Sequence, residues 1–218
     1  MDKLIPAIVV GTGSHSKPVI SLLRRSFKYN IKGLFDTSKD FNKNEKIMDV
    51  PVIGCLNQLD KNSFYQDHSF FIAVGDNSIR KKIFDFLNKQ ELKLPNLIDP
   101  TAYIDVSSSL GKANIFFYNS FLGPLVKIGS NNIINTSSII EHDSTIKSHC
   151  HFAPKSLICG NCLIEDLCFI GANATVINNL SISSNNIVGA GSTVIRNITE
   201  SFSTHVGSPA NKTSNSKL

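Results

Sequence analysis

Residues 118–147 read YNSFLG-PLVKIG-SNNIIN-TSSIIE-HDSTIK, and the same division into blocks of six continues without a break from Pro100 to Ile195. The fifth position of all sixteen blocks is apolar, and the third is nearly always small, with Leu180 as the large exception. The fifth positions are Ile104, Leu110, Phe116, Leu122, Ile128, Ile134, Ile140, Ile146, Phe152, Ile158, Ile164, Ile170, Val176, Ile182, Val188 and Val194. Because an α-helix repeats about every 3.6 residues and a flat strand every two, a period of six fits neither.

A period of six fits one short strand followed by a corner, so three blocks form a triangular coil of 18 residues. Coils stack about 4.8 Å apart through backbone hydrogen bonds, and each residue then lies over the residue 18 positions later. Sixteen blocks make about five coils, more than the roughly three repeats that a continuous core requires. We therefore expect a parallel β-helix, and the hexapeptide signature indicates that it is left-handed.

Turn-forming and small residues hold fixed places in these blocks. Glycine or asparagine often closes a block, and we expect corners with positive φ there. These closing residues are Gly111, Gly123, Gly129, Asn135, Gly171 and Gly189. Cys150, Cys162 and Cys168 occupy third positions, so we expect them to face inward as core residues, reduced rather than joined in a disulfide.

The composition of the 218 residues indicates a globular protein, with 41% hydrophobic and 18% charged residues. A formal charge of +5 is a mild excess that fits an enzyme of phosphorylated substrates, and we expect no nucleic-acid partner. The apolar runs are too short for membrane insertion or a secretory signal, since a spanning helix needs about 20 residues. With five cysteines, an odd number, we expect reduced thiols and a cytoplasmic protein.

Residues 1–99 alternate strand and helix patterns, which predicts a small Rossmann-like parallel α/β domain. The expected strands are 6–10, 31–35, 69–74 and 96–100, the expected helices are 18–27 and 78–89, and a charged loop leads to residues 50–54. We therefore expect a nucleotide-sugar-binding domain over residues 1–99, a β-helix domain over residues 100–211 and a flexible polar tail over residues 212–218.

A glycine-rich turn, Gly11-Thr12-Gly13-Ser14-His15, follows the first strand and is a candidate phosphate cradle at a helix start. It is not a dinucleotide fingerprint, because Ser16 stands where the third glycine belongs. A plain strand-to-helix turn is the alternative. Asp36, at the end of the second strand, is a candidate for holding a ribose hydroxyl or a base edge, or else a cap or turn residue.

The densest polar cluster lies inside the repeat and consists of Asn135, Glu141-His142-Asp143, His149 and His151. A histidine beside a carboxylate suits a general base, and a solvated corner is the alternative. A metal site of His142, His149 and His151 is a further alternative. We expect no metal there, because no histidine lies one coil away from His142.

Three motifs together resemble those of a known family: VGTGSH at 10–15, NTSSIIEHD at 135–143 and VGSPA at 206–210. The chain resembles, over nearly its whole length, the bacterial sugar acetyltransferases that join a small α/β nucleotide-sugar domain to a left-handed β-helix. These are the N-acetyltransferases of nucleotide-linked 4-amino sugars and the related sialic acid O-acetyltransferases.

The resemblance implies a homotrimer with acetyl-CoA in the groove between neighbouring β-helices, and no metal. It implies His142 as general base with Asp143 as its acidic partner. The substrate site would include Gly13, Ser14, His15, Asp36 and Asn135. The acetyl-CoA site would include His151, Gly160 with its backbone N–H toward the thioester, Gly171, Gly189 and Ala190.

The activity implied is N-acetylation of a UDP- or dTDP-linked amino-dideoxy sugar in the synthesis of surface polysaccharide, lipopolysaccharide or glycoprotein glycans. The amine would attack the thioester directly, without a covalent enzyme intermediate. Two alternatives stay open: O-acetylation of sialic acid or a related sugar acid, and a non-catalytic trimer that binds a nucleotide sugar.

Overall fold

A computed structural model describes residues 4–38, 44–59 and 65–213. The chain divides into two compact units, Met1–Ile98 and Asp99–Leu218. Among the residues described, no helix combines the length and the apolar composition that a membrane crossing requires.

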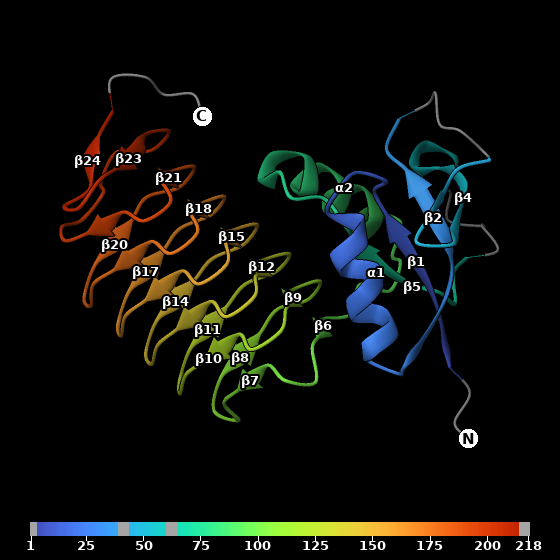
Figure 1. Ribbon diagram of the computed structural model, residues 1–218, viewed down its shortest axis with the longest axis horizontal. Helices are drawn as coiled ribbons and strands as arrows, with labels where there is room; N and C mark the ends of the chain where they lie inside the picture. Colours follow the sequence, from blue (N-terminus) through green and yellow to red (C-terminus); the bar gives the residue numbers. More distant parts are fainter. Residues whose placement is uncertain (1–3, 39–43, 60–64, 214–218) are drawn as a thin grey trace. The chain divides into compact units, whose positions relative to one another are not determined.

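The first unit is a small α/β layer built on a five-stranded sheet in the order β3-β4-β2-β1-β5 (Figure 1). All strand pairs are parallel except β3 with β4. Its elements are β1 (Ile5–Val10), α1 (Ser16–Arg25), β2 (Tyr29–Asp36), β3 (Lys46–Ile47), β4 (Val50–Cys55), the 3-10 turn η1 (Leu56–Gln58), β5 (Ser69–Ile72), α2 (Asn77–Lys89) and β6 (Leu97–Ile98).

The strands expected at 6–10 and 31–35 are confirmed as β1 and β2. The strand expected at 69–74 ends at Ile72, and the one expected at 96–100 is limited to Leu97–Ile98 and lies outside the five-stranded sheet. Strands β3 and β4 were not predicted, and the bounds of the first helix were wrong. Helix α1 begins at Ser16, two residues before Pro18, and ends at Arg25. Proline suits this place because the first turn of a helix leaves its N–H groups without helical partners. Phe27 has left the helix with a φ of 52°. Helix α2 begins one residue earlier than expected, where the Asp76 carboxylate accepts a hydrogen bond from the Ile79 N–H at 2.8 Å.

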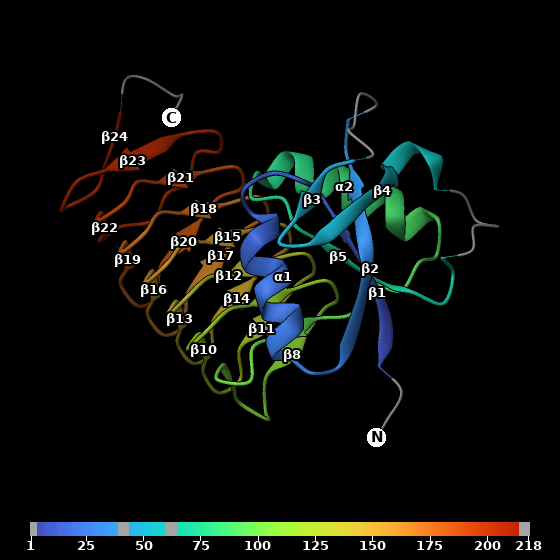
Figure 2. The ribbon, with the colours of Figure 1, turned by 45° about the vertical axis from the view of Figure 1, so that its right-hand side comes forward.

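The second unit is a parallel β-helix whose coils stack in register (Figures 1 and 2). Every block between Pro100 and Ile195 contributes one two-residue strand at its fourth and fifth positions, which confirms the division into sixes. The strands are β7 (Tyr103–Ile104), β8 (Ser109–Leu110), β9 (Ile115–Phe116), β10 (Phe121–Leu122), β11 (Lys127–Ile128), β12 (Ile133–Ile134), β13 (Ile139–Ile140), β14 (Thr145–Ile146), β15 (His151–Phe152), β16 (Leu157–Ile158), β17 (Leu163–Ile164), β18 (Phe169–Ile170), β19 (Thr175–Val176), β20 (Ser181–Ile182), β21 (Ile187–Val188) and β22 (Thr193–Val194).

These strands form the three faces of the coil. The β7 face contains β7, β10, β13, β16, β19 and β22; the β8 face contains β8, β11, β14, β17 and β20; the β9 face contains β9, β12, β15, β18 and β21. Each strand from β7 to β19 pairs with the strand 18 residues later, as Phe121 does with Ile139 and His151 with Phe169. The predicted vertical register is therefore confirmed.

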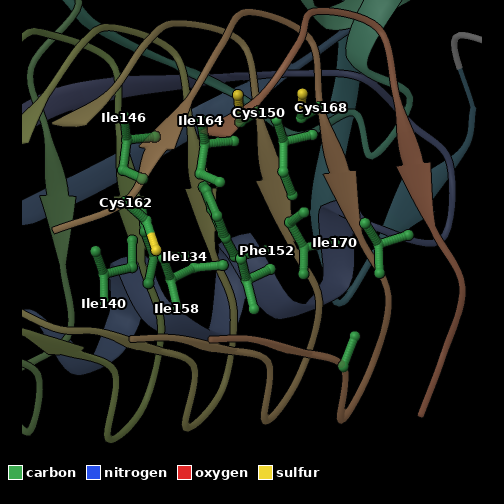
Figure 3. Packing of buried hydrophobic residues seen from close by; sticks show 14 of the residues in the cluster. Ile134, Ile140, Ile146, Cys150, Phe152, Ile158, Cys162, Ile164, Cys168 and Ile170 are labelled. Carbon is green, nitrogen blue, oxygen red and sulfur yellow. The ribbon is translucent and has the colours of Figure 1, made fainter. Parts of the chain in front are cut away.

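The interior is filled by the fifth positions, which lie in rows along the coil axis (Figure 3). From Phe116 to Val194 none of these side chains is more than 4% exposed, and the first two, Ile104 and Leu110, are partly buried at the end of the stack. Cys150, Cys162 and Cys168 are buried among them as predicted, and none of the five cysteines, all of them described, is joined in a disulfide. The core is thus a continuous apolar column. Burial of each large aliphatic side chain in it contributes roughly 1.5–3 kcal/mol to the stability of the fold.

The expected place of the positive-φ corners was wrong. Positive φ occurs at the second position of each block from Ala113 to Gly191, not at the sixth. The closing glycines serve close packing of neighbouring coils instead. A Cβ on Gly111 would lie 2.5 Å from the carbonyl oxygen of Gly129, and one on Gly171 would lie 2.5 Å from the amide nitrogen of Ala190.

The stack ends in two further strands, β23 (Thr204–Val206) and β24 (Asn211–Lys212). Strand β23 pairs with β21 in parallel and with β24 in antiparallel orientation. Lys212 therefore lies in a strand, whereas residues 214–218 of the expected tail fall outside the described residues.

Candidate active site

His142 and Asp143 form an ion-pair geometry at the corner between β13 and β14. The His142 Nδ1 and the Asp143 Oδ2 are 2.8 Å apart, and both side chains are about half exposed, at 58% and 51%. Asp143 has a φ of 59°, a left-handed conformation that aspartate tolerates better than most residues. A carboxylate at Nδ1 fixes the proton on that nitrogen and leaves Nε2 as the proton acceptor.

Gly160 lies one coil beyond His142, directly against the imidazole. A Cβ on Gly160 would lie 2.6 Å from Cε1 and 2.7 Å from Nε2 of His142. The coils are tied here by the Asn161 N–H, which donates to the His142 carbonyl oxygen at 2.8 Å. Only a residue without a side chain leaves this place for the ring.

Asn135, expected in the substrate site, and the expected acetyl-CoA residues other than Gly160 lie at a different corner, where the β9 face turns into the β7 face. The side-chain nitrogen Nδ2 of Asn135 is 3.4 Å from Nε2 of His151, a residue that is 8% exposed and whose ring packs edge-on against Phe169. Further along the same corner, Gly171 is packed closely against Gly189 and Ala190. Strand β13 separates this corner from His142. One chain therefore presents two edges and does not gather the expected residues around one point.

The remaining histidine of the polar cluster, His149, is buried beside another corner. Its Nδ1 lies 2.8 Å from the side-chain nitrogen of Asn131. Within the described residues, no three histidine, cysteine, aspartate or glutamate side chains are close enough to share a metal ion. His142, His149 and His151 thus point to different parts of the coil.

The first unit contains a cavity of about 240 Å³ at the carboxyl ends of β1, β2 and β5. It is lined by Gly11, Thr12, Gly13, Ser14, His15, Thr37, Ala73, Val74, Gly75 and Ile79. Gly11 is required in this turn, because its φ is 112° and a Cβ would lie 2.9 Å from Val74. Asp36 stands beside the cavity: its carboxylate accepts hydrogen bonds from the Thr12 hydroxyl at 2.8 Å and the Ser38 N–H at 2.7 Å.

Half of this cavity was missed by sequence reasoning, which assigned no site residue to the loop between β5 and α2. The signal was present, because Gly75 follows the apolar run SFFIAV directly. Ligands of open parallel sheets bind outside the carboxyl ends of the strands. Two strand ends with glycines, at Gly11 and Gly75, could therefore have been placed together.

His15 is held in its neutral form. Burial, and then the positive charge of Arg80, lower the pKa of His15 from 6.5 to about 4. The imidazole therefore offers a hydrogen-bond donor and an acceptor at neutral pH rather than a positive charge.

Replacing His15 by glutamine should flatten the pH dependence of stability between pH 6.5 and pH 4. The folded pKa lies below the unfolded one, so the unfolded chain binds more protons and stability falls as the pH drops through this window. The shift corresponds to a loss of about 3 kcal/mol in the wild type. Urea unfolding followed by circular dichroism measures it. His68 and His205, whose pKa values burial also lowers, keep their contributions in both proteins, so equal slopes would contradict the assignment to His15.

Residues 7–87 match the family of the PglD N-terminal domain. A histidine-to-asparagine mutant of perosamine N-acetyltransferase from Caulobacter crescentus, in complex with CoA and GDP-perosamine, is 27% identical, with a TM-score of 0.85 over 96% of this chain and 97% of that one. The acetyltransferase domain of PglB from Neisseria gonorrhoeae FA1090, in complex with acetyl coenzyme A, is 25% identical, with a TM-score of 0.86 over 97% and 100%.

An uncharacterised protein of Acanthamoeba polyphaga mimivirus is 32% identical over 126 residues. The match covers 58% of this chain and 24% of that protein, so the chain spans about a quarter of the length of this relative. The solved structures cover almost the whole chain and confirm the expected fold class, a small α/β region followed by a left-handed parallel β-helix.

Proposed function

We propose that this chain, a sugar acetyltransferase of the hexapeptide and β-helix type, transfers the acetyl group of acetyl-CoA to the amine of a nucleotide-linked amino sugar. The observation that carries the proposal is the His142–Asp143 pair, held on the ridge of the coil against Gly160. A general base at that point can promote acetyl transfer once a thioester and an amine are bound next to it.

The chemistry proceeds by direct attack. The neutral amine attacks the thioester carbonyl carbon, and Nε2 of His142 accepts the proton that the amine loses. The Gly160 backbone N–H is the donor proposed for the oxyanion of the tetrahedral intermediate, an interaction typically worth about 2.7–4 kcal/mol. Collapse of the intermediate breaks the carbon–sulfur bond, and the CoA thiolate leaves and takes up the proton.

The cavity of the first unit is the proposed site of the nucleotide. Gly13, Ser14 and His15 precede α1, whose N-terminal N–H groups favour an anion such as a diphosphate. Asp36 remains the proposed partner of a ribose hydroxyl or base edge. The hydrogen bond from the Thr12 hydroxyl holds its carboxylate beside the cavity. We retain UDP or dTDP as the nucleotide of the proposed substrate, and the solved relative binds GDP-perosamine.

A homotrimer is part of the proposal because the expected catalytic, substrate and acetyl-CoA residues of the second unit occupy two edges of one coil. The outward positions of the β7 face, which lies between these edges, are apolar over four coils: Tyr103, Phe121, Ile139 and Leu157. Packing of a second copy there would bring the His142 edge of one chain to the Asn135–His151 edge of the next. Acetyl-CoA would lie in that groove, along His151, Gly171, Gly189 and Ala190.

Replacing Leu157 by glutamate should dissociate the trimer and abolish turnover, because an unpaired charge in an apolar interface is costly. Leu163→Glu is the matched control: it changes the same residue type, also partly buried and outward-facing, on the mostly polar β8 face. Light scattering coupled to gel filtration measures the mass. If only Leu163→Glu dissociates the trimer, the interface lies on the β8 face instead.

The activity is tested by acetyl-CoA consumption with UDP-, dTDP- and GDP-linked amino sugars, and with a free sialic acid as the competing substrate class. We expect the product to gain one acetyl group on nitrogen. Acetylation of the free sugar acid alone would establish the O-acetyltransferase alternative. Binding of nucleotide sugar without thioester cleavage would establish the non-catalytic one.

A cytoplasmic location completes the proposal. It is supported by the need for acetyl-CoA. The product would then enter the assembly of a surface polysaccharide, lipopolysaccharide or glycoprotein glycan.

A further inference from the structure

Arg80, on the first turns of α2, is among the largest fully buried side chains of the protein, with 1% of its surface exposed. Its guanidinium donates to the loop that precedes α2. Nη1 donates to the carbonyl oxygens of Gly75 at 2.9 Å and Val74 at 3.3 Å, and Nη2 donates to the side-chain oxygen of Asn77 at 2.7 Å. A buried guanidinium that binds two successive carbonyls fixes the orientation of two successive peptide groups.

That orientation has a consequence for the cavity. In a planar trans peptide the C=O and the following N–H point in opposite directions. With the Val74 and Gly75 carbonyls turned inward to Arg80, the N–H groups of Gly75 and Asp76 are directed away from it. Val74 and Gly75 line the nucleotide cavity together with the Gly11–His15 turn, so a ligand in the cavity would lie on this side of the loop.

The charge of Arg80 also reaches the cavity. It acts on His15, which also lines the cavity, and contributes to the low pKa of that imidazole. A buried charge acts through a medium of lower dielectric constant than water and is screened less by salt. Arg80 therefore contributes positive charge behind a wall that carries backbone donors, and both favour an anion.

We propose that Arg80 is a positioning residue of the nucleotide site: it holds the loop between β5 and α2 so that the Gly75 and Asp76 N–H groups donate to a phosphate oxygen of the nucleotide. The inference rests on the proposed function for the identity of the ligand. Arg80 itself stays behind the loop and acts through it.

Calorimetry with UDP, dTDP and GDP, each alone, and with CoA tests the proposal on the full chain. We expect Arg80→Met to weaken the best-bound nucleotide at least tenfold and to leave CoA binding unchanged. Arg80→Lys should restore part of the nucleotide affinity, because lysine keeps the positive charge but lacks the planar set of N–H donors that binds both carbonyls. Lys82→Met, which removes an exposed charge from the same helix, is the control and should bind like the wild type. Nucleotide binding by Arg80→Met within twofold of the wild type would overturn the inference, as would a wild type that binds none of the three nucleotides.

A measurement on the wild type does not depend on whether the variants fold. The amide proton signals of Gly75 and Asp76 should move downfield in the nuclear magnetic resonance spectrum when the bound nucleotide is added, and the absence of a shift at both overturns the inference. A chain that shows these shifts but acetylates no amino sugar would retain the role of Arg80 and refute the proposed function instead.

Discussion

Replacement of His142 by asparagine is expected to lower kcat by about 10²–10⁴-fold, the usual contribution of a positioned general base. Asparagine retains a polar side chain that can bind to Asp143 but cannot accept a proton from the amine. The side chain is half exposed, so the β-helix core is untouched and the variant should fold. Acetyl-CoA consumption with the accepted amino sugar measures the effect.

The comparison variant is Asp143→Asn, which keeps an acceptor at 2.8 Å from Nδ1 but removes the charge. We expect a smaller loss of kcat than in His142→Asn, because the base remains and only its orientation and basicity are weakened. CoA binding should be unchanged in both variants. Full turnover by His142→Asn, with the oligomer and CoA binding intact, would remove His142 from the mechanism.

Gly160→Ala should lower kcat by about 10²-fold, since a displacement of about 1 Å can cost that much when it separates a base from its substrate. The added Cβ would lie 2.6–2.7 Å from Cε1 and Nε2 of His142, which forces the ring to leave its place. Alanine retains the backbone N–H, and the φ of Gly160 is not in the left-handed region, so the substitution separates the steric role from hydrogen bonding.

Asn178→Ala provides the control for Gly160→Ala. Asn178 is exposed and occupies the same corner one coil further from His142, and its truncation should leave kcat unchanged. A Gly160→Ala enzyme with wild-type kcat would show that the imidazole has another equally productive position. A loss of CoA affinity without a change in kcat would assign Gly160 to the binding of the co-substrate alone.

The repeat could be predicted in detail because one physical constraint, an apolar side chain at every sixth residue, fixes strand, face and register together. The predicted strand positions and the pairing of Phe121 with Ile139 follow from that constraint. The corner conformation could not be predicted in this way. Asparagine occurs at both the second and the sixth positions, and only the distance between coils shows that the closing glycines prevent a collision.

For a related reason, only the Gly11–His15 part of the nucleotide site could be predicted from the sequence. The Gly11–His15 turn is continuous in sequence and carries a recognisable pattern. The other part of the wall is 60 residues away and is shaped by Arg80, which in sequence is one of many basic residues on an amphipathic helix. A buried cation that orients a loop leaves no periodic pattern, so it becomes visible only when the carbonyls and the guanidinium are placed in space.

Because the coils of the β-helix stack in register, its length along the axis can change in discrete steps of one coil. Duplication of one 18-residue coil beyond Val176 would extend both ridges by about 4.8 Å, and every later side chain would keep its face. An insertion of any length that is not a multiple of six would instead turn apolar positions outward and expose them to water. Gene segments of this size are therefore the units by which such a scaffold can grow to fit a longer acyl carrier without rebuilding its interior.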